Sequence, residues 1–202
     1  MQLFGSTTSP FVRKVRVILA LKQIEYRFEN TIPWEDDSPV HQLNPLSKVP
    51  VLRDPGGQIW YDSALIADLL DTRYPEARLI PEDPELRLLD RQYQVLADGI
   101  CDAGVLIFLE RKRDPAQQNP AWIARQEKKI EKGIDALADR LENRAFLAAE
   151  KMTVADIAAL CTLEWLDIRA GMGSWKAAHP KLADWVARHT AEAPFASTRP
   201  QA

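Results

Sequence analysis

The chain has 202 residues, of which 46% are hydrophobic and 27% charged, so it has enough apolar material for one large domain or two small ones. Its net charge of −3 gives no basic excess, so we expect neither nucleic acid nor a membrane as a partner. No apolar run approaches the length of a membrane span, and the start lacks a signal-peptide pattern. We therefore expect a cytoplasmic protein.

The cysteine and histidine content gives no indication of a metal site. Cys101 and Cys161 stand far apart without a partner motif, which suits a reducing compartment, and both are expected to be small buried residues rather than a disulfide. The histidines are scattered, without metal-ligand spacing, so we predict no metal.

The first eighty residues mix strand and helix signals. Segments with strand-like or helix-like spacing of apolar residues, separated by turn signals, predict a βαβ unit, a loop with one irregular helical turn, and then a ββα unit. We expect the first two strands to be parallel because a right-handed crossover joins them. The predicted strands are Gln2–Gly5, Glu25–Asn30, Val49–Asp54 and Gln58–Tyr61, and the predicted helices are 10–23 and Asp62–Tyr74.

The rest of the chain shows only helical patterns. A Pro-rich stretch, residues 75–84, separates the two compositions. We predict a domain at 1–76, a linker at 77–84 and an all-helical domain at 85–202. The predicted helices start near Pro84, Pro120, Thr153 and Lys181, and the third is apolar enough to be central and buried.

The first helix has a strong start signal. Ser9 followed by Pro10 is typical of an N-cap with proline in the first turn. A polar turn between a strand and a helix N-terminus is also a common anion site. From these residues alone, Ser9 is either a plain cap or a cap that also does chemistry.

Four motifs in order give the sequence a family resemblance. The chain resembles a glutathione S-transferase, with a thioredoxin-like N-terminal half and a helical-bundle C-terminal half. "VLADGICDA" (Val95–Ala103) adds a likeness to bacterial members of the serine type. The motifs are "SPFVRKVRVILALK" from Ser9, "NPLSKVPVL" (Asn44–Leu52), "DSALIADLL" (Asp62–Leu70) and "TVADIAAL" (Thr153–Leu160).

The resemblance implies a glutathione-binding backbone at Val49. In this family the matching proline, here Pro50, follows a cis bond, which lets the preceding residue offer its N–H and C=O to a peptide ligand. An ordinary trans proline at the start of an edge strand is the alternative. Lys48 either approaches the glycyl carboxylate of glutathione or is a solvated loop lysine.

Asp62 and Ser63 open the third predicted helix. Either side chain can cap it. The family reading uses the same groups for the ligand, with Ser63 holding the γ-glutamyl carboxylate at the positive helix end and Asp62 placing the α-amino group. Thr153 and Asp156 fit a capping box, which we interpret as structural.

The resemblance also gives Ser9 a chemical role, as hydrogen-bond donor to the thiolate of glutathione. Thr8 and Ser6 are the alternatives, since the register is open by a residue. No cysteine precedes Cys101, which disfavours thiol–disulfide exchange, and no tyrosine precedes Tyr26, which disfavours the tyrosine-type classes.

The family places an electrophile pocket between the domains. We expect residues of the long fourth helix to form one wall, although core or dimer contacts are the alternative for most of them. The expected pocket residues are Phe11, Trp34, Asp98, Cys101, Asp102 and Val105. A homodimer is implied by the resemblance.

The predicted function is a glutathione transferase acting on a small electrophile. One alternative is a non-catalytic binding or assembly protein with the same fold. Another is a glutathione-dependent peroxidase, dehalogenase or isomerase, which would share the thiolate and differ in the pocket.

Overall fold

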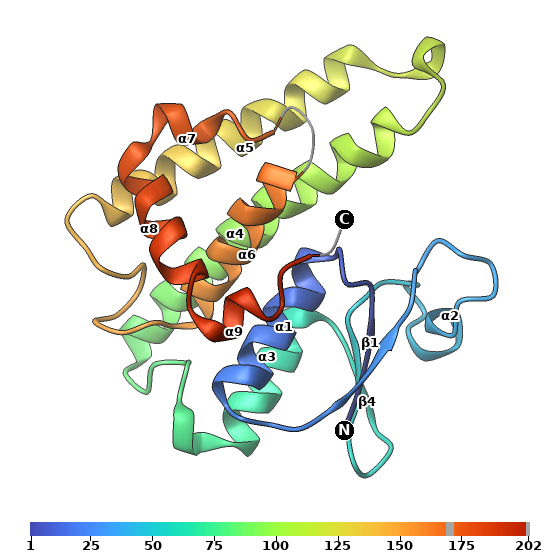
Figure 1. Ribbon diagram of the computed structural model, residues 1–202, viewed down its shortest axis with the longest axis vertical. Coiled ribbons are helices and arrows are strands. Elements are labelled where there is room, and N and C mark those ends of the chain that lie inside the picture. Colours follow the sequence, from blue (N-terminus) through green and yellow to red (C-terminus); the bar gives the residue numbers. More distant parts are fainter. Residues whose placement is uncertain (169–171, 201–202) are drawn as a thin grey trace. The chain divides into compact units, whose positions relative to one another are not determined.

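The computed structural model describes residues 1–168 and 172–200. The chain divides into two compact units, Met1–Ile80 together with the C-terminal segment from Thr190, and Pro81–His189. We call them unit 1 and unit 2 (Figure 1).

Unit 1 is built on a four-stranded sheet in the order β2-β1-β3-β4. β1 and β2 are parallel, while β1–β3 and β3–β4 are antiparallel. The predicted βαβ and hairpin connections are therefore confirmed, with β1 as predicted and the other three strands shorter than expected. The strands are β1 (Gln2–Gly5), β2 (Arg27–Asn30), β3 (Val51–Arg53) and β4 (Ile59–Trp60).

Helices cover both faces of this sheet, with α1 and α3 on one side and α2 on the other (Figure 1). Phe4 and Val51 pair across the sheet and pack with Val40 of α2. Because side chains alternate along a strand, the neighbouring pair Leu3 and Leu52 faces the opposite side, where α1 and α3 lie. The helices are α1 (Pro10–Leu21), α2 (Val40–Leu43), α3 (Ser63–Arg73), the short helix η1 (Pro75–Ala77) and α9 (Ala193–Ala196).

The C-terminal segment corrects the predicted domain division, which assigned residues 85–202 to one helical domain. The segment from Thr190 instead groups with unit 1. α9 packs on α1, the Phe195 side chain is fully buried, and the Arg13 guanidinium donates to the Phe195 carbonyl at 3.2 Å. A buried contact with no local sequence signal therefore decides where this segment belongs.

The predicted linker is also partly integrated into unit 1. The Lys22 ammonium lies 2.8 Å from the Asp71 carboxylate and donates to the carbonyls of Tyr74 and Ala77. Asp71 in turn accepts from the backbone N–H groups of Leu79 and Ile80. The chain is therefore attached to unit 1 as far as Ile80, where the first segment of this unit ends.

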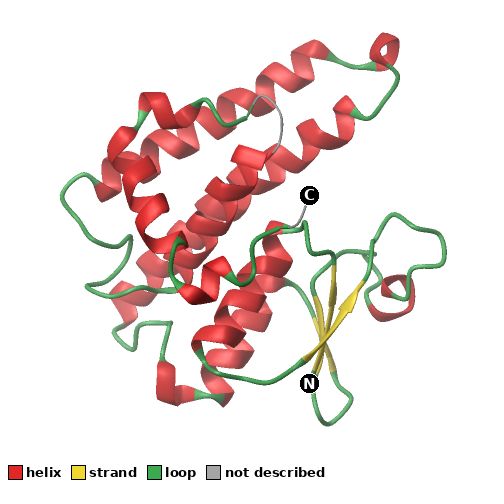
Figure 2. Ribbon diagram, in the orientation of Figure 1, coloured by secondary structure: helices red, strands yellow, loops and turns green. Residues whose placement is uncertain are grey.

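In its described part, unit 2 consists of helices and connecting loops (Figure 2). α4 packs against both α5 and α6 and is the central element. The start of α5 at Pro120 and its end at Leu141 agree with the prediction, whereas α7 was not predicted. The helices are α4 (Pro84–Arg111), η2 (Pro115–Gln117), α5 (Pro120–Leu141), α6 (Val154–Ile168), α7 (Trp175–Ala178) and α8 (Pro180–Thr190).

The predicted capping box opens α6. The Thr153 N–H and hydroxyl both donate to one oxygen of Asp156, at 2.8 and 2.9 Å, and the Leu147 N–H donates to the other. The sequence did not show the role of Asp90 on α4, which accepts the Ala155 N–H at 2.8 Å. The start of α6 is thus capped from its own first turn and from another helix.

By length and composition, α4 is the one described helix that is able to cross a membrane. This differs from the sequence prediction that no segment approaches such a length. However, the core helix of a soluble domain meets the same criterion, and α4 packs against α5 and α6.

Candidate active site

Strand register brings the predicted site segments of unit 1 to one edge of the sheet. Phe4, next to the end of β1, pairs with Val51 at the start of β3. Trp60, at the end of β4, pairs with Leu52. The start of α1, the residues before β3 and the start of α3 therefore follow or precede neighbouring strands at the same edge.

Ser9 is the N-cap of α1, as predicted. Its backbone is extended, with φ −79° and ψ 126°, and its hydroxyl oxygen accepts the Val12 N–H at 3.3 Å. The hydroxyl hydrogen has no acceptor among the described residues, and the side chain is partly exposed. Ser9 thus caps the helix with its oxygen and retains a donor for a ligand.

Ser6 and Thr8, the alternative donors, are engaged differently. Their hydroxyl oxygens lie 2.9 Å apart, so one hydroxyl donates to the other. The Ser6 oxygen also accepts the Thr8 N–H at 3.3 Å. These contacts brace the turn before α1, and they use the hydrogen of one of the two hydroxyls.

The Val49–Pro50 peptide bond is cis, as the resemblance implied. The Val49 side chain packs with the cluster around Phe4, Val40 and Val51, so it is held on the α2 side of the sheet. Among the described residues, the Val49 N–H and C=O have no hydrogen-bond partner. Its backbone is therefore open to an extended ligand, while the exposed Lys48 side chain lies beside it in the chain.

At the start of α3, capping is done by Asp62 rather than Ser63. One Asp62 oxygen accepts the N–H groups of Ala64 and Leu65, at 3.0 and 3.3 Å. The Ser63 side chain is only 3% exposed, and its hydroxyl has no hydrogen-bond partner in the described part of the chain. The Tyr61–Asp62 bond is also cis.

Comparison with known proteins agrees with this geometry. The family profile described as "Glutathione S-transferase, N-terminal domain" matches residues 3–78, and the profile described as "Glutathione S-transferase, C-terminal domain" matches residues 120–188. The chain belongs to the glutathione S-transferase family.

Relatives match over nearly the whole chain. The GST-like protein YibF of Escherichia coli is 37% identical over 200 residues, which is 99% of this chain and 98% of YibF. A glutathione S-transferase from Methylobacterium radiotolerans, in complex with glutathione sulfonate, is 40% identical with a TM-score of 0.95, covering 100% of this chain and 95% of that one. Another from Methylobacillus flagellatus, with GSH bound, is 38% identical with a TM-score of 0.95, covering 99% of both chains.

These matches establish the fold class of this family member. Unit 1 is the thioredoxin-like half and unit 2 the helical half, as the sequence predicted.

The residues predicted to line the electrophile pocket are divided between the two units. Phe11 and Trp34 belong to unit 1, partly exposed and 59% exposed, respectively. On α4, Asp98 and Val105 are partly buried and Asp102 is exposed. Cys101 has no exposed surface, so the prediction that it lines a pocket is wrong and its core alternative holds. For the other residues the pocket stays a prediction.

Sequence reasoning missed a buried carboxylate that joins β3, β4 and the end of α3. Asp54 at the end of β3 accepts from the Arg73 guanidinium at 2.8 Å, the Trp60 indole at 3.0 Å and the Gln58 N–H at 2.9 Å. Chiefly because of the Arg73 hydrogen bond, the pKa of Asp54 is lowered to about 2. The contact with α3 spans nineteen positions, so no local pattern reveals it.

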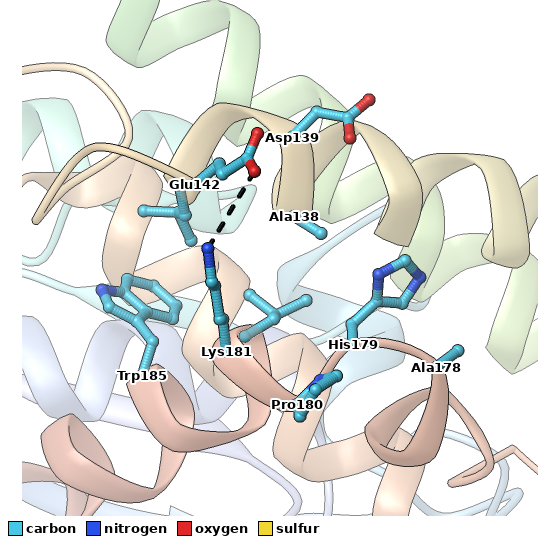
Figure 3. A pocket seen from close by; sticks show the side chains of 10 residues that line it. Ala138, Asp139, Glu142, Ala178, His179, Pro180, Lys181 and Trp185 are labelled. Carbon is cyan, nitrogen blue, oxygen red and sulfur yellow. Dashed lines mark ion pairs between the residues drawn. The ribbon is translucent and has the colours of Figure 1, made fainter.

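Unit 2 contains a pocket of about 330 Å³ between the end of α5 and the start of α8. Its walls carry His179, Lys181, Glu142 and the Trp185 ring, and Lys181 approaches Glu142 at 4.0 Å (Figure 3). None of the predicted site residues lines it. The charged side chains on its rim are solvated, with Lys181 79% and Glu142 63% exposed.

Within residues 1–168 and 172–200, no group of three or more His, Cys, Asp or Glu side chains is arranged to hold a metal ion.

Proposed function

We propose that this protein binds glutathione at the sheet edge of unit 1 and activates its thiol for attack on a small electrophile. The observation that carries the proposal is the common edge shared by Ser9, Val49 and Ser63, each with polar groups that form no hydrogen bond within residues 1–168 and 172–200. β1, β3 and β4 are neighbours, so the edge spans two strand spacings, about 10 Å. An extended tripeptide has about this length.

The proposed binding mode follows the order of the strands. The cysteinyl unit pairs with the Val49 backbone as an added strand would. The γ-glutamyl carboxylate lies at the N-terminus of α3, where the Ser63 hydroxyl donates to it and the helix dipole favours its charge. Asp62 has a second oxygen for the α-amino group, and Lys48 approaches the glycyl carboxylate. The thiol then points toward the start of α1.

Ser9 acts as a hydrogen-bond donor to the sulfur. A free thiol has a pKa near 8.5, so only about 3% is thiolate at pH 7. A hydrogen bond to the charged sulfur contributes about 1.5–3 kcal/mol, and the N-terminus of α1 adds about 0.3–1 kcal/mol. Together they lower the pKa of the thiol by roughly one to three units. The thiol proton passes to water, and the thiolate forms the C–S bond as a leaving group such as halide departs from the same carbon with its electron pair, while Ser9 keeps its own proton.

The decisive experiment is calorimetry of glutathione binding, with ultraviolet absorbance of the bound thiolate, in wild type and Ser9→Ala. We expect both proteins to bind and only the wild type to show thiolate near pH 7. Thr8→Val is the matched control, because it changes the neighbouring hydroxyl and should leave the thiolate signal intact. Loss of the cap should also lower the stability of Ser9→Ala by about 1 kcal/mol.

The remaining outcomes identify the alternatives. No binding by the wild type at millimolar glutathione would reject the enzyme and favour a non-catalytic binding or assembly protein. Thiolate retained in Ser9→Ala would move the donor to Thr8 or Ser6. If binding and thiolate are both present, turnover with alkyl halides, peroxides or isomerisable substrates decides between conjugation and the related reactions.

We also propose that the protein is a cytoplasmic homodimer. Support comes from large apolar side chains exposed one heptad apart on α4, Leu88 at 63% and Val95 at 72%, and from Leu65 on α3 at 45%. Val95→Glu should shift the mass in sedimentation from dimer to monomer. A wild-type protein that sediments as a monomer would contradict the proposal, and Leu106→Glu on the same helix is a comparison variant.

A further inference from the structure

The segment that leads into Val49 is held by α2 through apolar and polar contacts. On the apolar side, Val40 and Leu43 of α2 pack in one cluster with Val49. These contacts fix the Val49 side chain, but they leave the orientation of its backbone N–H undetermined. The polar contacts supply that orientation.

Asn44, directly after α2, stabilises the loop before Val49 through hydrogen bonds of its side chain. Its side chain is buried, accepts the Leu46 N–H at 3.0 Å and donates to the Lys48 carbonyl at 2.9 Å. In a trans peptide the C=O and the following N–H point in opposite directions. Because the Lys48 carbonyl points to Asn44, the Val49 N–H points away from Asn44.

Ser47 is the residue on which this orientation depends. Its φ of 51° lies in the left-handed region, which L side chains other than Asn and Asp seldom adopt. Its N–H donates to the Asn44 carbonyl at 2.8 Å. A serine in this conformation needs outside contacts to hold it there.

His41 provides such a contact. One ring nitrogen, Nε2, lies 2.9 Å from the Glu35 carbonyl, and the other, Nδ1, lies 2.9 Å from the Ser47 hydroxyl. A carbonyl only accepts, so Nε2 carries the hydrogen, and in the neutral ring Nδ1 accepts from Ser47. In the charged ring Nδ1 donates instead, so the contact persists in both charge states.

We propose that His41 is a positioning residue for the docking backbone of Val49. By holding Ser47 in the left-handed conformation, it fixes the peptide plane between Lys48 and Val49. The effect on glutathione affinity rests on the proposed function, whereas the effect on the segment itself does not. The exposed ring is not part of the apolar core, so its replacement should leave the fold of unit 1 in place.

The test compares four single variants, and later one double variant, with the wild type. His41→Phe keeps a ring and removes both hydrogen bonds, and His41→Gln restores a donor and an acceptor. Ser47→Ala removes the other partner. His179→Phe is the matched control, since it breaks a 2.9 Å contact of a histidine with Asp135 in unit 2.

The ligand-free measurement is hydrogen exchange of the amides at 46–49, where the Leu46 and Ser47 N–H groups, both bonded to Asn44, are the ones expected to respond. We expect His41→Phe and Ser47→Ala to exchange faster there, with the rest of unit 1 and the unfolding midpoint unchanged. His41→Gln and His179→Phe should resemble the wild type. Unchanged exchange at 46–49 in His41→Phe would overturn the proposal without reference to any ligand.

The ligand measurement is the dissociation constant of glutathione. We expect His41→Phe to weaken binding about five- to tenfold, as for one lost hydrogen bond, with the same thiolate fraction at saturation as the wild type. The double variant with Ser47→Ala should be no weaker than either single variant. Faster exchange with unchanged affinity would show that His41 does not position the docking backbone. If the wild type fails to bind, the proposed function is rejected and the exchange result alone decides the role of His41.

Discussion

At the scale of the residue, several side chains of unit 1 join elements that are distant in the sequence. Asp54 is the clearest case, because its two oxygens accept hydrogen bonds from β4, the β3–β4 turn and the end of α3. Its carboxylate is largely buried, so these donors replace the water that it would otherwise bind. The end of α3, at Arg73, is attached to the sheet partly through this residue.

Asp54 should make the stability of unit 1 depend on pH. Its pKa of about 2 lies below the ordinary value of 3.8, so its contribution is complete above pH 4 and is lost as the pH falls toward 2. Asp54→Asn should lower the urea midpoint at pH 7 and flatten its dependence between pH 4 and 2. The exposed Asp37→Asn is the control, and an equal effect of both variants would contradict this assignment.

Some residues of the candidate site were predictable and others were not. Ser9 and the cis bond before Pro50 were found because short motifs place them next to a helix start and a strand start. Outside the site, the bracing roles of Asp54 and Asp90 were not found, because their partners Arg73 and Ala155 are distant in the sequence. The sequence did not predict that Asp62 caps α3 instead of Ser63, since either residue type can cap a helix.

At the scale of the element, α5 and α6 both pack closely against α4. A Cβ on Gly104 would lie 2.7 Å from the Trp165 ring of α6, and one on Gly133 of α5 would lie 2.4 Å from Ile100 of α4. Both distances are shorter than van der Waals contact permits. Glycine in "ICDAG", which is unusual for a helix, is therefore explained by the packing of α4 on α6.

Gly104→Ala should destabilise unit 2 by about 1–3 kcal/mol, because the added methyl group overpacks the contact. The measurement is urea unfolding. Trp165→Phe removes the part of the ring that the methyl group meets, so the double variant should lose less stability than the two single variants add up to. Strict additivity would show that the ring contact is not the cause.

Elements with clear start signals and a long apolar period in the sequence were predictable. α5 begins at Pro120 and ends at Leu141 as expected, because a proline start and a long apolar period mark it. α7 and α9 have four residues each, too few to show a helical period. Their positions depend on tertiary contacts such as the buried Phe195.

At the scale of the whole molecule, we expect the two units to respond differently to acid. Burial raises the pKa of Asp90 and of Asp156 in unit 2 above 3.8. Each therefore favours the folded state most at low pH, and this contribution declines as the pH rises through the interval above 3.8. Asp54 in unit 1 behaves in the opposite way.

Acidification from pH 4 to 2.5 should therefore loosen unit 1 before unit 2. Pepsin digestion followed by mass spectrometry measures this, with unit 2 peptides of the same sample as the internal reference. We expect the ratio of unit 1 to unit 2 cleavage to rise over this interval. A constant ratio, or earlier cleavage within α4 and α6, would contradict the expectation, and Asp90→Asn should leave the response of unit 1 unchanged.

The placement of α9 on α1 has a consequence for biosynthesis. Unit 1 takes its strands from residues 2–60 and its last helix from residues 193–196, so the Arg13 guanidinium meets the Phe195 carbonyl only after unit 2 has been synthesised. Unit 2 is continuous in the sequence and leaves the ribosome before that segment does. The unit that is synthesised first is therefore completed last, and until then a nascent chain exposes the surface of α1 that α9 later covers.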